Sequence, residues 1–294
     1  MDVWRFCGVT PSIQVPHSLE WLETGEEGRT WLAQLPAQVE RCVERWDLTL
    51  GEPFPTANVS FTVPARRRDG TEAVLKVPYP DRESEHEAQA LAVWAGDGAV
   101  MLLEEAVDLG AFLIERCVPG TPLSSSGQDV SLDVLIGLLR RLWRPVPGPP
   151  FRSLAEEAGW WASHLRQNWE HAGRPFAERL VDAALAALRD LPPSQGEQVL
   201  VHQDLHGGNV LRARREPWLV IDPKPLAGER EFALAPVIRS FELGAGRLDV
   251  RRRLDLLTSE LGLDRERARL WCIAQTVAWY SPGHIDVATW LLDM

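Results

Sequence analysis

Long hydrophobic runs and an excess of positive charge are both missing from this sequence. No stretch approaches the roughly 18 consecutive apolar residues that a membrane-spanning helix needs. The opening residues, MDVWRFCGVT, have no basic region followed by an apolar one. The net charge of −11 argues against a nucleic-acid partner, because binding phosphates requires a basic surface. We therefore expect a soluble cytoplasmic protein that binds neither membrane nor nucleic acid.

Lysine and cysteine are also scarce. Only two of the 31 basic residues are lysines, so a lysine in an unusual setting, such as Lys76 inside the apolar run AVLKV, is a candidate for a specific role. The cysteines show no short paired spacing, which predicts neither a zinc cluster nor a disulfide framework but reduced core residues. They are Cys7, Cys42, Cys117 and Cys272.

The chain of 294 residues, 45% of them hydrophobic, is long enough for two domains with cores of their own. The first part predicts a helix at 36–46, with Pro36 in its first turn, and then short strands interrupted by one helix at 83–94. RRDG at 67–70 predicts a hairpin turn. The strands are expected at 59–63, 73–77, 99–103 and 111–117.

Pro119-Gly120 and the polar stretch after them mark a change of pattern, so we expect a domain boundary that divides the chain into 1–117 and 118–294. The second part predicts amphipathic helices around a small group of β segments, and the whole chain therefore predicts an α+β fold. The helices are expected at 131–143, 152–171, 175–190, 231–242, 248–261, 264–279 and 284–293, and the β segments at VLVH, NVLR and WLVID.

Polar residues are concentrated in HQDLHGGN, at 202–209, between two apolar runs. If the flanking runs are strands, Asp204 lies on a loop and Asp222 at a strand end, where rigid scaffolds commonly hold catalytic side chains. Four residues separate Asp204 from Asn209. This is the spacing of a kinase catalytic loop, in which the aspartate accepts the substrate hydroxyl proton and the asparagine holds a metal. Asp222 is then a candidate second metal ligand.

These residues resemble the catalytic core of the kinase-like phosphotransferases. HQDLHGGNVL, IDPKP and GEREFALAP together resemble the aminoglycoside/hydroxyurea antibiotic resistance kinase family, and the resemblance covers most of the chain. It implies a bilobal protein-kinase-like fold, with a small β-rich nucleotide-binding lobe at 1–117 and a larger, mainly helical catalytic and substrate-binding lobe at 118–294. It also implies that Asp204 is the catalytic base and that Asn209 and Asp222 coordinate Mg²⁺.

By this resemblance the enzyme transfers phosphate from ATP to a hydroxyl of a small cationic molecule, such as the aminoglycoside streptomycin. Two guanidinium groups on streptomycin suit the acidic balance of the chain. The resemblance does not separate such an acceptor from an amino sugar or another cellular metabolite.

The first part of the chain offers an independent check, because a kinase needs a strand lysine for the nucleotide phosphates and a helix glutamate to orient it. Lys76 lies in an apolar strand, and burying its ammonium group without an anion would be costly. Glu87, eleven residues later, borders the apolar stripe of the next helix and is the predicted partner, with Glu83 and Glu85 as rivals.

The nucleotide loop departs from the kinase pattern. GEPFPTANVSFTV has no glycine triplet, so the phosphates are expected beneath a loop around Asn58 and Ser60. The segment LIERCVPG resembles the linker between lobes, where the backbone of Glu115 to Cys117 would meet the adenine edge. Lys224, in DPKP, either reaches a phosphate or is a surface residue after a turn.

Other functions remain open at this point. A zinc metallohydrolase could use His202, Asp204 and His206, because an H-x-D-x-H spacing on a strand places all three on one face. That hypothesis leaves Lys76, Asn209 and Asp222 unexplained. A non-catalytic kinase-like module is a third possibility. We expect His202 to hold its loop by hydrogen bonds, and we assign no role to His206.

Aromatic and acidic residues in the second part have two interpretations each. The sequence holds 13 tryptophans, which could stack on sugars, but those in helix patterns are expected in the core. Acidic residues could pair with a cationic acceptor, although solvated surface is the expected position of each. The tryptophans in helix patterns include Trp160, Trp161 and Trp279, and the acidic residues include Glu229, Glu231 and Asp286.

Overall fold

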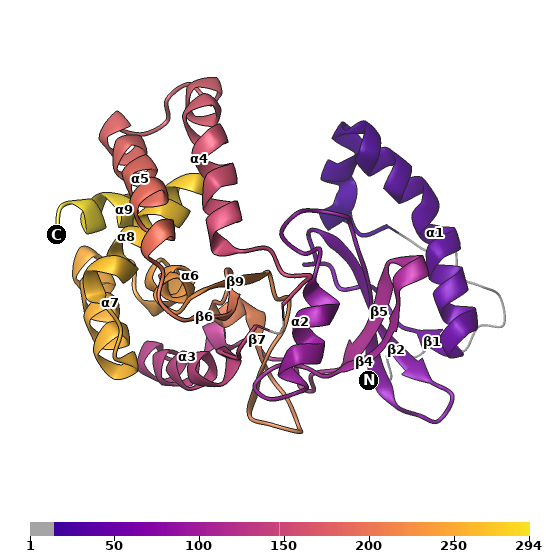
Figure 1. The fold of residues 1–294 in the computed structure, drawn as a ribbon. Helices are drawn as coiled ribbons and strands as arrows, with labels where there is room; N and C mark the ends of the chain where they lie inside the picture. The colour runs from indigo at the N-terminus through magenta and orange to yellow at the C-terminus, as the bar shows by residue number, and fades with distance from the viewer. Residues whose placement is uncertain (1–14, 147) are drawn as a thin grey trace. The chain divides into compact units, whose positions relative to one another are not determined.

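The computed structural model describes residues 15–146 and 148–294 (Figure 1). The chain divides into two compact units, Met1–Gly96 with Val100–Val118, and Asp97–Ala99 with Pro119–Met294. The main division thus falls one residue after the boundary expected at 117/118, and the short segment Asp97–Ala99 belongs to the second unit. Cys7 lies outside the described residues.

The first unit is built on an antiparallel five-stranded sheet with the strand order β1-β2-β3-β5-β4. One long helix packs its apolar face on this sheet, and a short helix connects β3 to β4. The elements are η1 (His17–Thr24), α1 (Glu26–Trp46), β1 (Leu48–Leu50), β2 (Ser60–Arg67), β3 (Glu72–Pro78), α2 (Glu87–Trp94), β4 (Leu102–Ala106), η2 (Val107–Leu109) and β5 (Ala111–Glu115).

Helix α1 corrects the prediction of a helix that starts at Pro36. The helix begins at Glu26, and Pro36 lies inside it. Trp31 and Leu35 on one side of the proline and Val39 on the other are all buried in one core. Their contacts with the sheet outweigh the loss of one helical hydrogen bond at the proline, which has no N–H to donate.

The sheet confirms the predicted hairpin turn and corrects one strand. Gly70 has φ +85° and donates its N–H to the carbonyl of Arg67 at 2.9 Å, a backbone conformation that suits glycine. The strand expected at 99–103 begins instead at Leu102, because Ala99 forms a parallel bridge with Val220 in the second unit. Strand β1 was not predicted.

Helix α2 is shorter than the predicted helix at 83–94. The carboxylate of Asp81 accepts the N–H groups of Glu83 at 2.7 Å and Ser84 at 3.1 Å, so these residues form a turn. Such a local side-chain bond competes with the helical hydrogen bonds. The helix therefore begins at Glu87.

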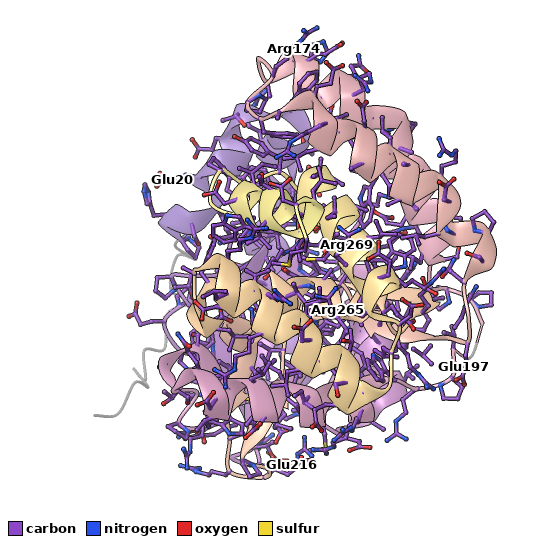
Figure 2. The ribbon with its side chains drawn as sticks, turned by 90° about the vertical axis from the view of Figure 1, so that its left-hand side faces the viewer. Glu20, Arg174, Glu197, Glu216, Arg265 and Arg269 are labelled. Atoms are coloured by element: carbon purple, nitrogen blue, oxygen red, sulfur yellow. The ribbon has the colours of Figure 1, made fainter. Side chains whose placement is uncertain are left out.

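The second unit is mainly helical, and α8 lies at its centre, in contact with α5, α6, α7 and α9. Six of the seven predicted helices are confirmed, with ends within three residues. Figure 2 shows Arg265 and Arg269 on α8, where the Nε group of Arg265 donates to Asp255 of α7 at 2.6 Å. The six are α3 (Gln128–Leu142), α4 (Leu154–His171), α5 (Glu178–Asp190), α7 (Arg247–Leu261), α8 (Arg265–Ala278) and α9 (Ile285–Leu292).

The seventh predicted helix, at 231–242, is broken into three short pieces: η6 (Phe232–Leu234), α6 (Ala235–Ile238) and η7 (Phe241–Leu243). The buried guanidinium of Arg253 donates to the carbonyl of Ile238, which a continuous helix would have bonded to its own N–H at 242, and to the carbonyls of Leu243 and Gly244. Within the described residues no helix is both long enough and apolar enough to cross a membrane.

Two antiparallel strand pairs complete the second unit. β6 (Gln198–His202) pairs with β9 (Pro225–Glu229), and β7 (Val210–Arg212) pairs with β8 (Trp218–Val220). β9 was not predicted, because PLAGE has a proline, a glycine and no alternation; Pro225 is tolerated as the first residue of the strand. The two pairs bring the loop after β6 next to the segment between β8 and β9.

Candidate active site

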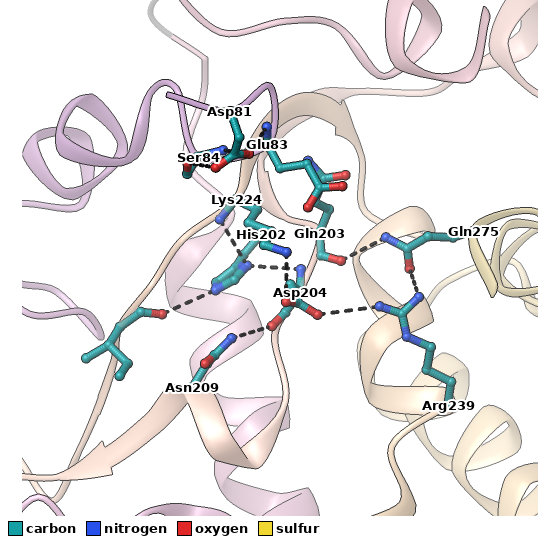
Figure 3. Close-up of polar contacts among 11 residues, drawn as sticks. Asp81, Glu83, Ser84, His202, Gln203, Asp204, Asn209, Lys224, Arg239 and Gln275 are labelled. Atoms are coloured by element: carbon teal, nitrogen blue, oxygen red, sulfur yellow. Dashed lines mark hydrogen bonds and ion pairs between the residues drawn. The ribbon is translucent and has the colours of Figure 1, made fainter. Parts of the chain in front are cut away.

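His202, the last residue of β6, fastens the polar loop that follows it. Its imidazole is buried; Nδ1 accepts the N–H of Asp204 at 3.1 Å, and Nε2 lies 3.4 Å from the carbonyl of Ile221 (Figure 3). Burial lowers the pKa of His202 to about 4, so the ring is neutral and carries its proton on Nε2. The predicted loop-holding role of this histidine is confirmed.

The Asp204 carboxylate lies between two cations. Lys224 Nζ is 3.4 Å from Oδ2, and Arg239 Nη2 is 3.5 Å from Oδ1 (Figure 3). Burial raises the pKa of Asp204, but the charges of Lys224, His206 and Arg239 outweigh burial and hold the pKa below its ordinary value. The side chain is 21% exposed, so a deprotonated carboxylate remains accessible at neutral pH.

The two cations share an aromatic support at the end of α8. The Nζ of Lys224 is 4.8 Å, and the guanidinium carbon of Arg239 5.0 Å, from the centre of the Trp279 ring. Lys224 was expected either to reach a phosphate or to be a surface residue; its contacts with Asp204 and Trp279 place it in the site, although they do not show a phosphate contact.

Arg239 and Gln275 belong to the site and were missed in the sequence. Arg239 is 5% exposed, and its Nη1 donates to Gln275 Oε1 at 3.0 Å. Gln275 Nε2 donates in turn to the backbone carbonyl of Gln203 at 2.8 Å, directly before Asp204. Arg239 is one arginine among many in the sequence. It lies in the segment predicted as one continuous helix, so its direction towards Asp204 could not be predicted.

Asn209 directly precedes β7, and Asp222 comes two residues after the end of β8, near a strand end as predicted. Asn209 Nδ2 donates to the backbone carbonyl of Asp204 at 3.0 Å, which turns its Oδ1 atom the other way. The carbonyl of Asn209 accepts the N–H of Ile221 at 2.9 Å, one residue before Asp222. Asp222 is exposed and has φ +51°, a strained conformation that aspartate tolerates and that is concentrated at functional sites.

The zinc arrangement considered for His202, Asp204 and His206 is wrong. β6 ends at His202, so the three residues do not alternate along a strand. The Nδ1 atom of each histidine accepts a backbone N–H, from Asp204 and from Gly208. In the part of the chain that the structure describes, no three His, Cys, Asp or Glu side chains are grouped as a metal would require.

The first unit contains the predicted lysine–glutamate pair. Lys76 lies in β3 and Glu87 begins α2; both are buried, with 3% and 2% of their surfaces exposed. Lys76 Nζ donates to both carboxylate oxygens of Glu87, at 2.6 and 2.7 Å. The structure thus joins Lys76 to the expected partner, which Glu83 and Glu85 rivalled in the sequence.

The other predicted nucleotide-binding residues differ in exposure. Asn58 is exposed in the loop between β1 and β2, and its carbonyl accepts Trp21 Nε1–H at 2.8 Å. Ser60 is buried, with its hydroxyl 2.8 Å from that of Thr62. Glu115 ends β5 and donates its N–H to the Met101 carbonyl at 2.9 Å, while Cys117, two residues later, is half-buried.

Two further predictions need correction. Trp160 is 43% exposed on α4 and not in the core, whereas its neighbour Trp161 is buried and Trp279 is half-buried. Glu229 is neither a solvated residue nor open to an acceptor, because it is 1% exposed and accepts Arg267 Nε–H at 2.7 Å.

The two remaining acidic residues lie nearer the surface. Glu231 is partly exposed, and its carboxylate lies 3.4 Å from the N–H of Asp264. Asp286 is exposed, as expected for a solvated residue.

Comparison with solved structures identifies the fold as protein-kinase-like. The choline kinase LicA of Streptococcus pneumoniae matches with a TM-score of 0.59 at 13% identity, over 86% of this chain and 95% of that one. The aminoglycoside phosphotransferase APH(4)-Ia matches with a TM-score of 0.53 at 16% identity, over 87% and 96%. The predicted fold class, with a small β-rich unit and a larger helical one, is confirmed.

Comparison with curated sequences is more specific. The chain is 41% identical to the streptomycin 6-kinase of Streptomyces griseus over 258 residues, which is 85% of this chain and 83% of the relative. It is also 41% identical to the hydroxyurea phosphotransferase of Kitasatospora aureofaciens over 260 residues, 86% and 74% of the two chains. The family model for aminoglycoside/hydroxyurea antibiotic resistance kinases matches residues 45–281. The chain therefore belongs to the aminoglycoside/hydroxyurea antibiotic resistance kinase family.

Proposed function

We propose that this protein is an ATP-dependent O-phosphotransferase that inactivates an aminoglycoside, streptomycin or a close relative of it, by phosphorylating one hydroxyl. The observation that carries this proposal is the Asp204 carboxylate, which is kept deprotonated by neighbouring cations and remains partly exposed. Relatives named streptomycin 6-kinase, at 41% and 40% identity, support the acceptor class.

Asp204 acts as the general base. Its carboxylate accepts the proton of the acceptor hydroxyl while the hydroxyl oxygen forms a bond to the γ-phosphorus of ATP. The bond between that phosphorus and the bridging oxygen breaks, and ADP leaves with the electron pair. His202 and Asn209 hold the backbone on both sides of the base, so the carboxylate needs little reorganisation during the reaction.

Asn209 and Asp222 have the donor atoms that Mg²⁺ prefers, an amide oxygen and carboxylate oxygens. Asn209 uses its nitrogen for Asp204, which leaves the oxygen available as a ligand. When bound, Mg²⁺ supplies positive charge to the phosphate oxygens of ATP. Lys224 is placed to add a second positive charge beside the acceptor hydroxyl.

The first unit serves as the nucleotide-binding lobe and the second as the catalytic and substrate-binding lobe. Lys76 holds phosphate oxygens of ATP with its ammonium group. Two hydrogen bonds to Glu87 fix the orientation of that group. The loop with Asn58, which leads into β2 at Ser60, covers the phosphates, and the backbone from Glu115 to Cys117 meets adenine.

The acceptor is expected to be cationic, since the chain has a net charge of −11. Its cationic groups must lie away from the reacting hydroxyl, because Lys224 and Arg239 already flank Asp204. Hydroxyurea is the second acceptor to test, given the relative of that name at 41% identity.

A coupled ADP-release assay with Mg²⁺ tests the proposal on streptomycin, other aminoglycosides, hydroxyurea and glucosamine. Asp204→Asn should lower acceptor-dependent turnover by about 10²- to 10⁴-fold, the usual contribution of a general base. Asp133→Asn, an exposed aspartate on α3, makes the same chemical change as a control and should leave turnover unchanged. Wild-type protein that binds ATP but phosphorylates none of these acceptors would refute the acceptor class.

A further inference from the structure

A buried arginine reaches the candidate base from an element that no motif marks. Arg239 follows α6, is 5% exposed, and places one terminal nitrogen beside Asp204 and the other on Gln275. Gln275 comes from α8 and bonds the carbonyl of Gln203. Figure 3 shows this chain of contacts running from Gln203 through Gln275 and Arg239 to Asp204.

We propose that Arg239 is a positioning residue for phosphotransfer, an inference that rests on the function proposed above. Its guanidinium group, called the fork below, contacts the Asp204 carboxylate directly and the backbone before Asp204 through Gln275. The two terminal nitrogens of the fork act on two consecutive residues, Gln203 and Asp204. One end, through the amide of Gln275, fixes the main chain at Gln203, and the other fixes the direction of the carboxylate.

The chemistry of the fork explains why arginine is needed. A guanidinium group is planar and presents its donors at fixed angles, whereas a lysine ammonium is a point charge on a flexible stem. The 3.0 Å bond to Gln275 and the 3.5 Å contact with Asp204 use the two terminal nitrogens of one plane. The face of Trp279, 5.0 Å from the guanidinium carbon, holds that plane.

A purely structural role fits the position less well. Taking a guanidinium out of water costs free energy that a buried ion pair commonly fails to recover, and apolar residues of similar volume are often as stable or more stable. Arg253 shows the structural alternative in the same unit, because it donates only to backbone carbonyls at the ends of short helices. Arg239 instead contacts the functional carboxylate.

Three variants test the inference in the full-length enzyme. Arg239→Gln removes the charge and the fork, Arg239→Lys keeps the charge alone, and Gln275→Glu keeps the bond to Arg239 but cannot donate to the Gln203 carbonyl. Arg267→Gln is the matched control, since Arg267 is also an ion-paired, mostly buried arginine but contacts Glu229 and not the site. Each is measured for kcat, for KM of ATP and of the acceptor, and for its thermal midpoint.

We expect Arg239→Gln and Gln275→Glu to lower kcat by about 10- to 100-fold with both KM values changed by less than about twofold, because a small misplacement of a reacting group has effects of that size. Arg239→Lys should recover only part of the loss. Arg267→Gln should lower the thermal midpoint and leave kcat unchanged. A fall in kcat no larger than that of Arg267→Gln, or a complete recovery in Arg239→Lys, would overturn the inference.

Crystal structures of wild type and Arg239→Gln supply a readout that does not need turnover. The inference expects the Asp204 carboxylate to turn or become disordered in the variant, with Lys76 and Glu87 unchanged. An unchanged carboxylate overturns it. If the wild-type enzyme transfers no phosphate, the proposed function fails, and this structural comparison still decides whether Arg239 holds Asp204.

Discussion

Replacing His202 by glutamine should make the stability of the protein less sensitive to acid. The wild-type imidazole is 2% exposed, and burial lowers its pKa from the ordinary 6.5 to about 4. In the unfolded chain the same ring regains its ordinary pKa. Between these two values the unfolded state binds a proton that the folded state does not, so acidification favours unfolding.

The size of the effect follows from the two pKa values. The difference of about 2.5 units corresponds to about 3 kcal/mol of unfolding free energy in total, present in full above pH 6.5 and lost as the pH falls towards 4. Between about pH 7 and about pH 5, this histidine alone should account for a loss of about 2 kcal/mol. Glutamine at the same position does not titrate and should remove that share.

Urea unfolding followed by tryptophan fluorescence measures the difference, with wild type and His202→Gln each compared at about pH 7 and about pH 5. Glutamine is expected to destabilise the protein at the higher pH, since it cannot reproduce both bonds of the ring. His171→Gln, an exposed histidine at the end of α4, is the control and should leave the pH dependence as in wild type. Equal acid sensitivity in wild type and His202→Gln would refute the reasoning.

Three other variants probe separate features. Glu229→Gln should lower the free energy of unfolding by about 2–3 kcal/mol in urea, because it leaves the guanidinium of Arg267 without its buried carboxylate; a loss below about 1 kcal/mol would show that the pair matters little. Gly70→Ala should cost about 1 kcal/mol from strain at φ +85° alone, since no atom lies within 4 Å of the added Cβ, and an unchanged thermal midpoint would contradict this. Asp222→Asn should keep the stability, because asparagine also tolerates φ > 0, while the Mg²⁺ concentration needed for half-maximal turnover rises by about tenfold or more; no change in that concentration would exclude Asp222 as a ligand.

The sequence predicted those parts of the site that depend on short stretches of chain. Lys76 and Glu87 could be paired because a lysine in an apolar strand needs an anion and the next helix offers one at its apolar border. Asp204 and Asn209 are set by one loop, and its spacing is visible in the sequence. The fold class followed from the change from short β runs to long helical patterns, and the comparisons confirm it.

The rest depends on contacts between distant residues, which one sequence does not reveal. Gln275 and Arg239 are 36 residues apart and meet only because α8 packs against α6. β9 forms although its sequence has no strand pattern, because β6 offers a partner edge. Glu229 looked like a surface residue until the structure placed Arg267 beside it.

Because of the β7–β8 hairpin, the distance between Asn209 and Asp222 does not depend on the number of residues between them. Val210 pairs with Val220 and Arg212 with Trp218, so Asn209, just before β7, and Asp222, just after β8, both lie at the end of the hairpin opposite to its 213–217 turn. Residues added to that turn would lengthen the chain between Asn209 and Asp222 without changing the distance between them. An insertion or a reporter in this turn would therefore leave the register of the proposed metal ligands unchanged, as long as Arg215 and Glu216 keep their bonds to Ala99 and Arg141.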